Sequence, residues 1–280
     1  MRKKEISVLE LYYYENSICA ERALMVLAEK QIDDWMPRHI DLFKREQFSP
    51  AYLKLNPRAQ VPTLVHDEQV IRESSVIADY IDDLKADNPL KPAGRIARAQ
   101  MQEFIKDADE AGYQGVASLS FTAIFRHKLM AMSEADRTAY WAGQTELERT
   151  QRQQSCVFEG LESPYAQRAI ASWERTFGNI ETTLADGRRW LMGDGFTLAE
   201  LNLATFIARL DGLRMLPVWL DDRPRTQTWW AAIKARPSYT KARVGPSGGE
   251  AETYAREGAK LVEEMQRRRA AYLEAYRGKL

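Results

Sequence analysis

Residues 56–83 read NPRAQVPTLVHDEQVIRESSVIADYIDD, and this stretch decides how the first part of the chain folds. An Asn-Pro pair interrupts regular structure, and two short apolar runs, 61–66 and 69–71, then flank the pair Asp67-Glu68. Short apolar runs joined by two polar residues are typical of a β-hairpin. Residues 73–84 have apolar side chains at helical spacing, which predicts a helix directly after the hairpin. We expect the inner face of that helix to carry Val76, Ile77, Tyr80 and Ile81.

The residues before the hairpin also alternate between strand and helix patterns. Residues 6–13 are rich in β-branched and aromatic side chains, which predicts a strand, and residues 17–30 have the apolar spacing of a helix. Residues 35–42 predict a second strand, which Pro37 confines to a sheet edge because proline cannot donate a ladder hydrogen bond. The first 85 residues therefore predict a small mixed α/β layer.

After a linker that contains proline and glycine (86–94), the remaining sequence has the patterns of helices. The longest periodic stretch, 95–132, is expected to break near Gly112 or Gly115. Thr197 and Glu200 form a T-x-x-E capping box at the start of another helix. Further helices are predicted over 163–184, 197–210, 223–236 and 250–276. The predicted organisation is an α/β domain (1–85), a linker (86–94), an all-helical domain (95–245) and a charged helical tail (246–280).

The composition narrows the class of protein. The chain has 280 residues, 45% hydrophobic and 29% charged, which is a globular mixture of about two domains. Forty basic and forty acidic residues give a net charge of zero, so no nucleic-acid partner is expected. Two cysteines and three scattered histidines predict neither a disulfide framework nor a metal site. No apolar run predicts a membrane span or a signal peptide, and the expected compartment is the cytoplasm.

The segment between the first strand and the first helix could carry chemistry. It places Asn16, Ser17 and Cys19 at a predicted helix N-terminus, where free backbone N–H groups stabilise an anion such as a thiolate. Ordinary helix capping explains the same residues, because Asn and Ser are common N-caps.

The segments around Pro62 and Ser74 could likewise bind a ligand or have only a structural role. A cis bond before Pro62 would expose the Val61 backbone to an extended peptide, yet cis forms only about 5–6% of such bonds in folded proteins. Ser74 could cap its helix or hold a ligand carboxylate at the helix N-terminus.

Together, three motifs resemble the glutathione transferase family. They are YYYENSICAERALMVLAEK (12–30), the VPTL and ES motifs within residues 56–83, and WLMGDGFTLAELNLATF (190–206). The resemblance covers residues 6–242. It implies a thioredoxin-like N-terminal domain, an all-helical C-terminal domain, a cis bond before Pro62, glutathione as co-substrate and a homodimer or a heterodimer with a related subunit.

The resemblance also implies a glutathione site. Val61, next to Pro62, would pair its backbone with the cysteinyl part, and Glu73 and Ser74 would hold the γ-glutamyl end. Gln60, with Lys44 or Gln47, would hold the glycyl carboxylate. Ala59 departs mildly from the glycine common in the family at this position.

The branch of the family is left open by the sequence. The Asn16-Ser17 pair and the segment ELERTQRQQSCVFEGLESP (146–164) resemble bacterial β-aryl etherases, which cleave lignin ether bonds. The Ser17-Ile18-Cys19 run resembles reductive dehalogenases of chlorinated hydroquinones, which use a cysteine there. Asn16, Ser17 and Cys19 all remain candidates for activating the thiol. Another conjugating transferase is an alternative to the dehalogenase, and a non-catalytic subunit of a heterodimer is the third possibility.

A second, aromatic substrate is expected to bind in the helical domain. By family analogy, its candidates are Tyr113, Phe121, Phe125, His127, Tyr140 and Trp141, against the alternative of core packing. The charged tail would fold over the cleft or a partner, or remain solvated.

Overall fold

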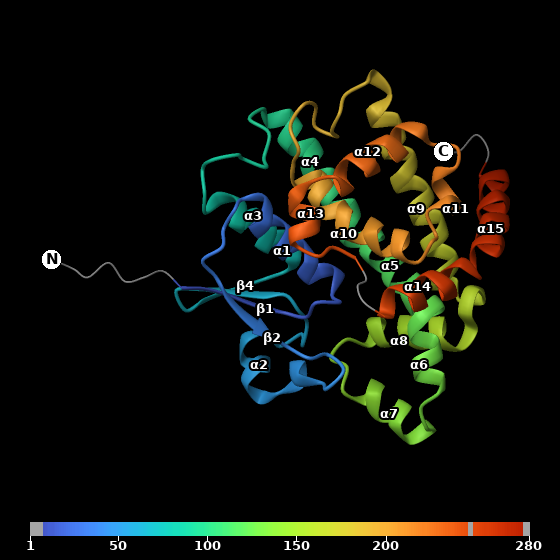
Figure 1. The fold of residues 1–280 in the computed structure, drawn as a ribbon. Coiled ribbons are helices and arrows are strands. Elements are labelled where there is room, and N and C mark those ends of the chain that lie inside the picture. The colour runs from blue at the N-terminus through green and yellow to red at the C-terminus, as the bar shows by residue number, and fades with distance from the viewer. Residues whose placement is uncertain (1–7, 246–248, 277–280) are drawn as a thin grey trace. The chain divides into compact units, whose positions relative to one another are not determined.

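The chain forms two compact units (Figure 1). The computed structural model describes residues 8–245 and 249–276. The first unit contains the chain up to Pro89 together with Pro237–Val244, and the second contains Leu90–Arg236 and the residues from Gly245 onward. Pro237–Val244, which the sequence analysis placed in the helical domain, thus belongs to the α/β unit.

The first unit is built on a four-stranded mixed sheet. Its strands are β1 (Leu9–Tyr13), β2 (Met36–His39), β3 (Thr63–His66) and β4 (Gln69–Arg72), in the order β2-β1-β3-β4. β1 pairs in parallel with β2 and antiparallel with β3, and β3 and β4 form the predicted hairpin. β2 is an edge strand, as Pro37 predicts. Residues 6 and 7 of the predicted first strand lie outside the described residues.

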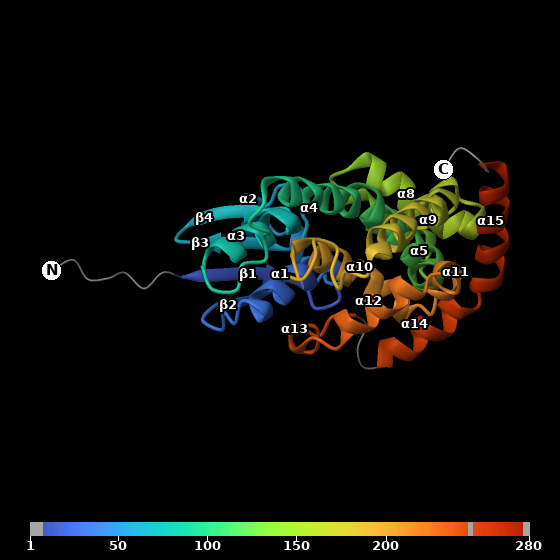
Figure 2. The ribbon, with the colours of Figure 1, turned by 90° about the horizontal axis from the view of Figure 1, so that it is seen from above.

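Helices cover both faces of this sheet. The helices of this unit are α1 (Ile18–Glu29), α2 (Pro50–Leu55), α3 (Ser74–Asp83) and α13 (Pro237–Lys241), of which α13 packs on α1. α1 and α3 pack together on one face, and α2 lies on the other (Figures 1 and 2). α2 was not predicted, because six residues are too few to show the apolar spacing of a helix. Its signals were Ser49, whose hydroxyl accepts from the Tyr52 N–H, and Pro50 at the first helical position.

The inner face of α3 differs from the prediction at one position. Ile77 and Ile81 are fully buried, but Val76 is 53% exposed. The buried stripe runs through positions 74, 77, 78 and 81, which is the i, i+3, i+4, i+7 spacing of one helix face. Position 76 lies outside that stripe, so the prediction for Val76 is wrong.

The second unit is helical. Its first stretch is α4 (Arg95–Asp107), η2 (Ala108–Gly112), α5 (Tyr113–Ser120), η3 (Phe121–Phe125) and α6 (Arg126–Met130). η2 and η3 are π-helical turns within a continuous helical stretch, so the predicted break near Gly112 or Gly115 is wrong. The remaining helices are α7 (Glu134–Ala142), α8 (Leu147–Glu159), α9 (Pro164–Thr183), α10 (Leu198–Gly212), α11 (Pro217–Leu220), α12 (Pro224–Lys234), α14 (Gly249–Ala259) and α15 (Val262–Ala275). Thr197 caps α10 with the predicted capping box. Within residues 8–245 and 249–276, no helix combines the length and apolar character of a membrane span.

The charged tail is two helices, not the single helix predicted for 250–276. The chain turns after Ala259, where the Leu261 N–H donates to the Gly258 carbonyl at 3.0 Å. α14 passes so close to the end of α10 that a Cβ on Gly258 would lie 2.0 Å from the Leu213 carbonyl oxygen. Residues 246–248 of the predicted flexible break, and 277–280 of the tail, lie outside the described residues.

Ion pairs hold α15 on its own unit. Arg269 bonds Glu174 on α9 at 2.5 Å and Asp222 at 3.1 Å, and the Arg269 guanidinium lowers the pKa of Asp222. Arg268 reaches Glu162 and donates to the Leu161 carbonyl. The tail is therefore a packed part of the helical unit rather than a solvated extension.

Candidate functional site

One end of the sheet collects the predicted glutathione-binding segments. Thr63 on β3 is opposite Tyr12 on β1 and Arg72 on β4. The residues just beyond each of these positions therefore meet at the same sheet end: the 13–17 segment, Val61-Pro62 and Glu73-Ser74. β2 runs parallel to β1 and brings the segment after His39 to this end, where the Ile40 N–H donates to the Tyr13 carbonyl at 2.8 Å.

The N-terminus of α1 is capped by Ser17. Its hydroxyl oxygen accepts from the Ala20 N–H at 3.3 Å. Ser17 is therefore an N-cap, as the helix-capping interpretation predicted. Asn16 lies in the turn before it, and Cys19 in the first turn of the helix. All three side chains are half-buried, and the Cys19 thiol forms no disulfide. A thiolate placed at this end would face the positive end of the α1 dipole.

The bond between Val61 and Pro62 is cis, as the resemblance implies. The loop before it is fixed by its neighbours: the Gln60 carbonyl accepts from the Tyr52 hydroxyl at 2.6 Å and from the Asn56 amide at 2.9 Å. The backbone of this loop is therefore held in one conformation at the start of β3.

The N-terminus of α3 carries Glu73 and Ser74. Ser74 is 9% exposed, and its hydroxyl oxygen accepts from the guanidinium of Arg22, a fully buried residue of α1, at 3.2 Å. The hydroxyl hydrogen then remains to donate to a carboxylate. Glu73 has a positive φ of 67° and forms an exposed ion pair with Arg58 at 2.5 Å. The Glu73 carboxylate is accessible to a ligand ammonium.

Lys44 and Gln47 differ in accessibility. Lys44 is exposed, with its ammonium 3.3 Å from the carboxylate of Asp41, and the Lys44 contacts lower the pKa of Asp41. Gln47 is buried, and its amide donates to the Leu42 carbonyl at 3.4 Å. Lys44 is therefore the more available of the two for a glycyl carboxylate.

Four of the six aromatic-substrate candidates lie together in the second unit. Phe121, Phe125 and Tyr140 pack against a buried cluster that contains Trp141. The Phe121 and Phe125 ring centroids are 4.9 Å apart, and those of Tyr140 and Trp141 are 5.9 Å apart. We call this group the aromatic cluster.

The structure separates the other two candidates from the aromatic cluster. Tyr113 lies two turns earlier along the helix, with its ring 6.0 Å from that of Phe206. His127 is 63% exposed, with its ring nitrogen 3.4 Å from the Glu257 carboxylate on α14. Lys260 and Arg256 beside Glu257 hold the pKa of that carboxyl at about 2.

Sequence reasoning missed Arg22 and the buried N–H group of Trp141. Arg22 is part of an apparently ordinary amphipathic helix, and only its complete burial beside Ser74 shows its role. Trp141 was counted for its ring, but its indole N–H is also buried and has no acceptor among the described residues. Apolar periodicity contains no information on either contact.

The sequence matches two family models in the expected order. Residues 16–84 match the glutathione S-transferase N-terminal domain, and residues 163–232 match the glutathione S-transferase C-terminal domain. A maleylacetoacetate isomerase of Dictyostelium discoideum is 32% identical over 152 residues, which cover 53% of this chain and 69% of the relative.

The chain belongs to the glutathione S-transferase family. A tetrachloro-p-hydroquinone reductive dehalogenase of Sphingobium chlorophenolicum is 23% identical over 85% of this chain and 97% of its own. The protein LigF of Sphingobium sp. is 26% identical over 82% of this chain and 91% of its own. The crystal structure of the β-etherase LigF superimposes with a TM-score of 0.73, at 24% identity, over 84% of this chain and 98% of that one. Members of this family use glutathione as co-substrate.

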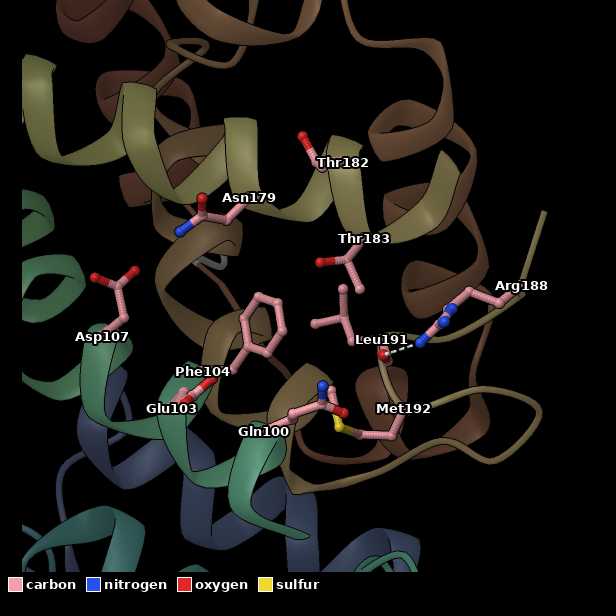
Figure 3. A pocket seen from close by; sticks show the side chains of 10 residues that line it. All are labelled: Gln100, Glu103, Phe104, Asp107, Asn179, Thr182, Thr183, Arg188, Leu191 and Met192. Carbon is pink, nitrogen blue, oxygen red and sulfur yellow. Dashed lines mark hydrogen bonds between the residues drawn. The ribbon is translucent and has the colours of Figure 1, made fainter. Parts of the chain in front are cut away.

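This glutathione S-transferase also has a pocket of about 320 Å³ between α4 and α9, whose lining contains none of the predicted site residues (Figure 3). Its charged groups are largely satisfied within the protein. Asp107 accepts from the Thr176 hydroxyl at 2.7 Å, and Arg188 donates to the Leu191 carbonyl and to Asp186. The Arg188 contacts lower the pKa of Asp186 to about 2. The pocket therefore gives no indication of a ligand.

Proposed function

We propose that this protein is a glutathione transferase that cleaves β-aryl ether bonds in lignin-derived aromatic compounds in the cytoplasm. The thiolate of bound glutathione attacks the carbon of a C–O bond next to a carbonyl. A C–S bond forms, the C–O bond breaks, and the electron pair leaves with the phenolate, which takes a proton from water. The products are a glutathione thioether and a phenol.

The convergence of three segments at one sheet end carries this proposal. The Val61 backbone beside its cis bond would pair with the cysteinyl part of glutathione. Glu73 would accept the γ-glutamyl ammonium, and Ser74 would donate to the adjacent carboxylate. Gln60 and Lys44 would serve the glycyl carboxylate, with Gln47 as the weaker candidate because its amide already donates to Leu42.

Asn16 is our proposed activator of the thiol. Its amide offers two N–H donors and does not ionise, whereas the Ser17 hydroxyl offers one donor and also serves as the N-cap of α1. A hydrogen bond donated to the thiolate favours the charged form and lowers its pKa. Ser17 and the positive end of the α1 dipole would further stabilise the thiolate.

The aromatic cluster is the proposed site for the second substrate. Its rings suit stacking on an aryl group, and the unsatisfied Trp141 N–H suits an ether or carbonyl oxygen. The likeness to LigF, whose crystal structure is described as that of a β-etherase, favours an ether over other leaving groups. Tyr113 and His127 are weaker candidates because they lie apart from the cluster. We further propose that the active protein is a homodimer, or a heterodimer with a related subunit.

Ser74→Ala should weaken glutathione binding about ten- to a hundredfold. The change removes a charge-assisted hydrogen bond of roughly 1.5–3 kcal/mol and leaves the buried Arg22 guanidinium without this acceptor. Isothermal titration with glutathione measures the effect. Ser75→Ala, on the next residue of α3, is the matched control and should bind normally. Equal affinity of wild type and Ser74→Ala would show that Ser74 does not hold the ligand.

Asn16→Ala should move the acidic limb of the pH–rate profile upward by about one unit, which corresponds to roughly 1.4 kcal/mol. Losing the amide donor raises the thiol pKa, so a higher pH is needed for the same thiolate fraction. The measurement is turnover of an aryl-ether ketone across the pH range. If only Ser17→Ala moves the limb, Ser17 is the activator. If neither variant moves it, the helix terminus or Cys19 is responsible.

A reductive dehalogenase is the second candidate function, favoured by the position of the Cys19 thiol in the first turn of α1 and by the dehalogenase relative. The two functions predict opposite results for Cys19→Ser. An etherase should retain most aryl-ether turnover, because Cys19 is then a packed bystander. Complete loss of reductive turnover with a chlorinated hydroquinone would favour the dehalogenase. Retention on a glutathione resin without either activity would indicate a non-catalytic subunit.

A further inference from the structure

Three arginines line a second pocket of the helical unit, which we call the arginine pocket. Its volume is about 300 Å³, enough for a small organic molecule. It is lined from the η2–α5 stretch by Glu110, Ala111, Gln114, Gly115 and Ser118, from α8 by Arg152, and from α9 by Tyr165, Arg168, Ala169, Ser172 and Arg175. None of these residues belongs to the proposed glutathione site or to the aromatic cluster.

Small residues on two facing helices create the hollow. The lining positions recur every three or four residues along both α5 and α9, so each helix presents one face. Gly115 allows the helices to approach closely, because a Cβ there would lie 2.8 Å from the Trp173 ring nitrogen. The other small residues of the lining are alanines and serines of the same two helical stretches.

The charge of the pocket is not balanced within the described chain. Arg152 is only 7% exposed, and a buried charge is normally paired. Yet no carboxylate of residues 8–245 or 249–276 forms an ion pair with Arg152, Arg168 or Arg175. The one acidic residue of the lining, Glu110, is paired with Lys106 at 2.5 Å.

Tyrosine rings hold two of the guanidinium groups in place. Arg152 lies over the Tyr113 ring at 5.8 Å, and Arg168 lies over the Tyr165 ring at 5.5 Å. Stacking on a ring face leaves the N–H donors at the guanidinium edge available for oxygen atoms. The Ser118 and Ser172 hydroxyls donate to carbonyls of their own helices. The pocket therefore presents mainly positive N–H donors.

We propose that the arginine pocket binds a small anion that carries two or more carboxylate or phosphate groups. Three guanidinium groups match such a ligand because each forms paired, charge-assisted hydrogen bonds with a carboxylate or a phosphate. A neutral aromatic compound would leave the buried Arg152 charge unbalanced. The proposal is independent of the proposed transferase function, because it involves residues of the helical unit alone.

Isothermal titration of the full chain at low ionic strength tests this, with citrate as the carboxylate probe and pyrophosphate as the phosphate probe. We expect saturable binding of at least one probe. Arg152→Gln, and separately the double variant Arg168→Gln/Arg175→Gln, should each weaken it about tenfold or more. Arg149→Gln, on the same helix α8 but outside the pocket, is the matched control and should bind like wild type.

The two probes separate the two ligand chemistries: tighter binding of citrate assigns carboxylates, and tighter binding of pyrophosphate assigns phosphates. If Arg152→Gln fails to fold, the double variant decides, because Arg168 and Arg175 are exposed. The proposal is overturned if neither probe binds or if the four proteins bind equally. It is also overturned if the arginine variants change only the oligomeric state, since acids of a second subunit would then balance the charge.

Discussion

Asp82→Ala should destabilise the α/β unit by about 3–5 kcal/mol, the largest effect we expect of a single substitution here. Asp82 and Lys30 form a buried ion pair at 2.8 Å between α3 and the end of α1, with side chains 3% and 0% exposed. Removing the carboxylate leaves a buried ammonium whose remaining bond is to the Asn88 carbonyl at 3.0 Å. Hydrogen exchange measured by mass spectrometry on α1 and α3 peptides reports the loss within this unit.

The neighbouring Asp83→Ala is the matched control for this prediction. Asp83 is exposed, so its loss should change stability by less than about 1 kcal/mol. The double variant Lys30→Met/Asp82→Leu removes both charges and should recover most of the stability, because apolar replacements of a buried pair are often neutral. A similar effect of Asp82→Ala and Asp83→Ala would contradict the proposed importance of the buried pair.

Glu200→Ala should destabilise the helical unit by about 3 kcal/mol. The Glu200 carboxylate is fully buried and accepts from the Thr197 N–H at 2.9 Å, from the Thr197 hydroxyl at 2.7 Å and from the Leu191 N–H. Burial raises the pKa of Glu200, while these donors favour the ionised form. The substitution removes the Glu200 half of the capping box at the start of α10 and leaves the buried Thr197 and Leu191 N–H groups without this acceptor.

Thermal unfolding and exchange of α10 peptides measure the Glu200 effect. Thr197→Ala should cost less, about 1 kcal/mol, because the two backbone N–H groups keep their acceptor. Glu252→Ala on α14 is a suitable surface control, since Glu252 is exposed. A Glu200 variant as stable as the Glu252 variant would show that the capping box is not an important contribution.

Local patterns predicted most of the fold. The hairpin at residues 61–72, the edge position of β2 and the capping box at Thr197 each follow from neighbouring residues in the sequence. Elements that depend on tertiary contacts were missed or misplaced. α2 is shorter than two helical turns, Val76 was assigned to the wrong face, and the turn after Ala259 is set by packing on Leu213.

For the candidate site, the sequence predicted the residues but not their arrangement in space. The cis bond at Pro62 follows from family resemblance, because backbone energetics alone favours trans. The residues at the sheet end could be named, but the register that brings them together is a property of the folded sheet. The charge imbalance of the arginine pocket could not be predicted at all. Arg152, Arg168 and Arg175 look like ordinary surface residues of helices until their distances to carboxylates are known.

The discontinuous α/β unit has a consequence for how the protein is made. α13 packs against α1, and Lys241 pairs with Asp33 at 2.5 Å, although more than two hundred positions separate them. A ribosome releases α1 long before α13, since chains grow from the N-terminus at about 5–20 residues per second. The nascent α/β unit must therefore wait, with one surface of α1 uncovered, until the helical segment 90–236 has been translated.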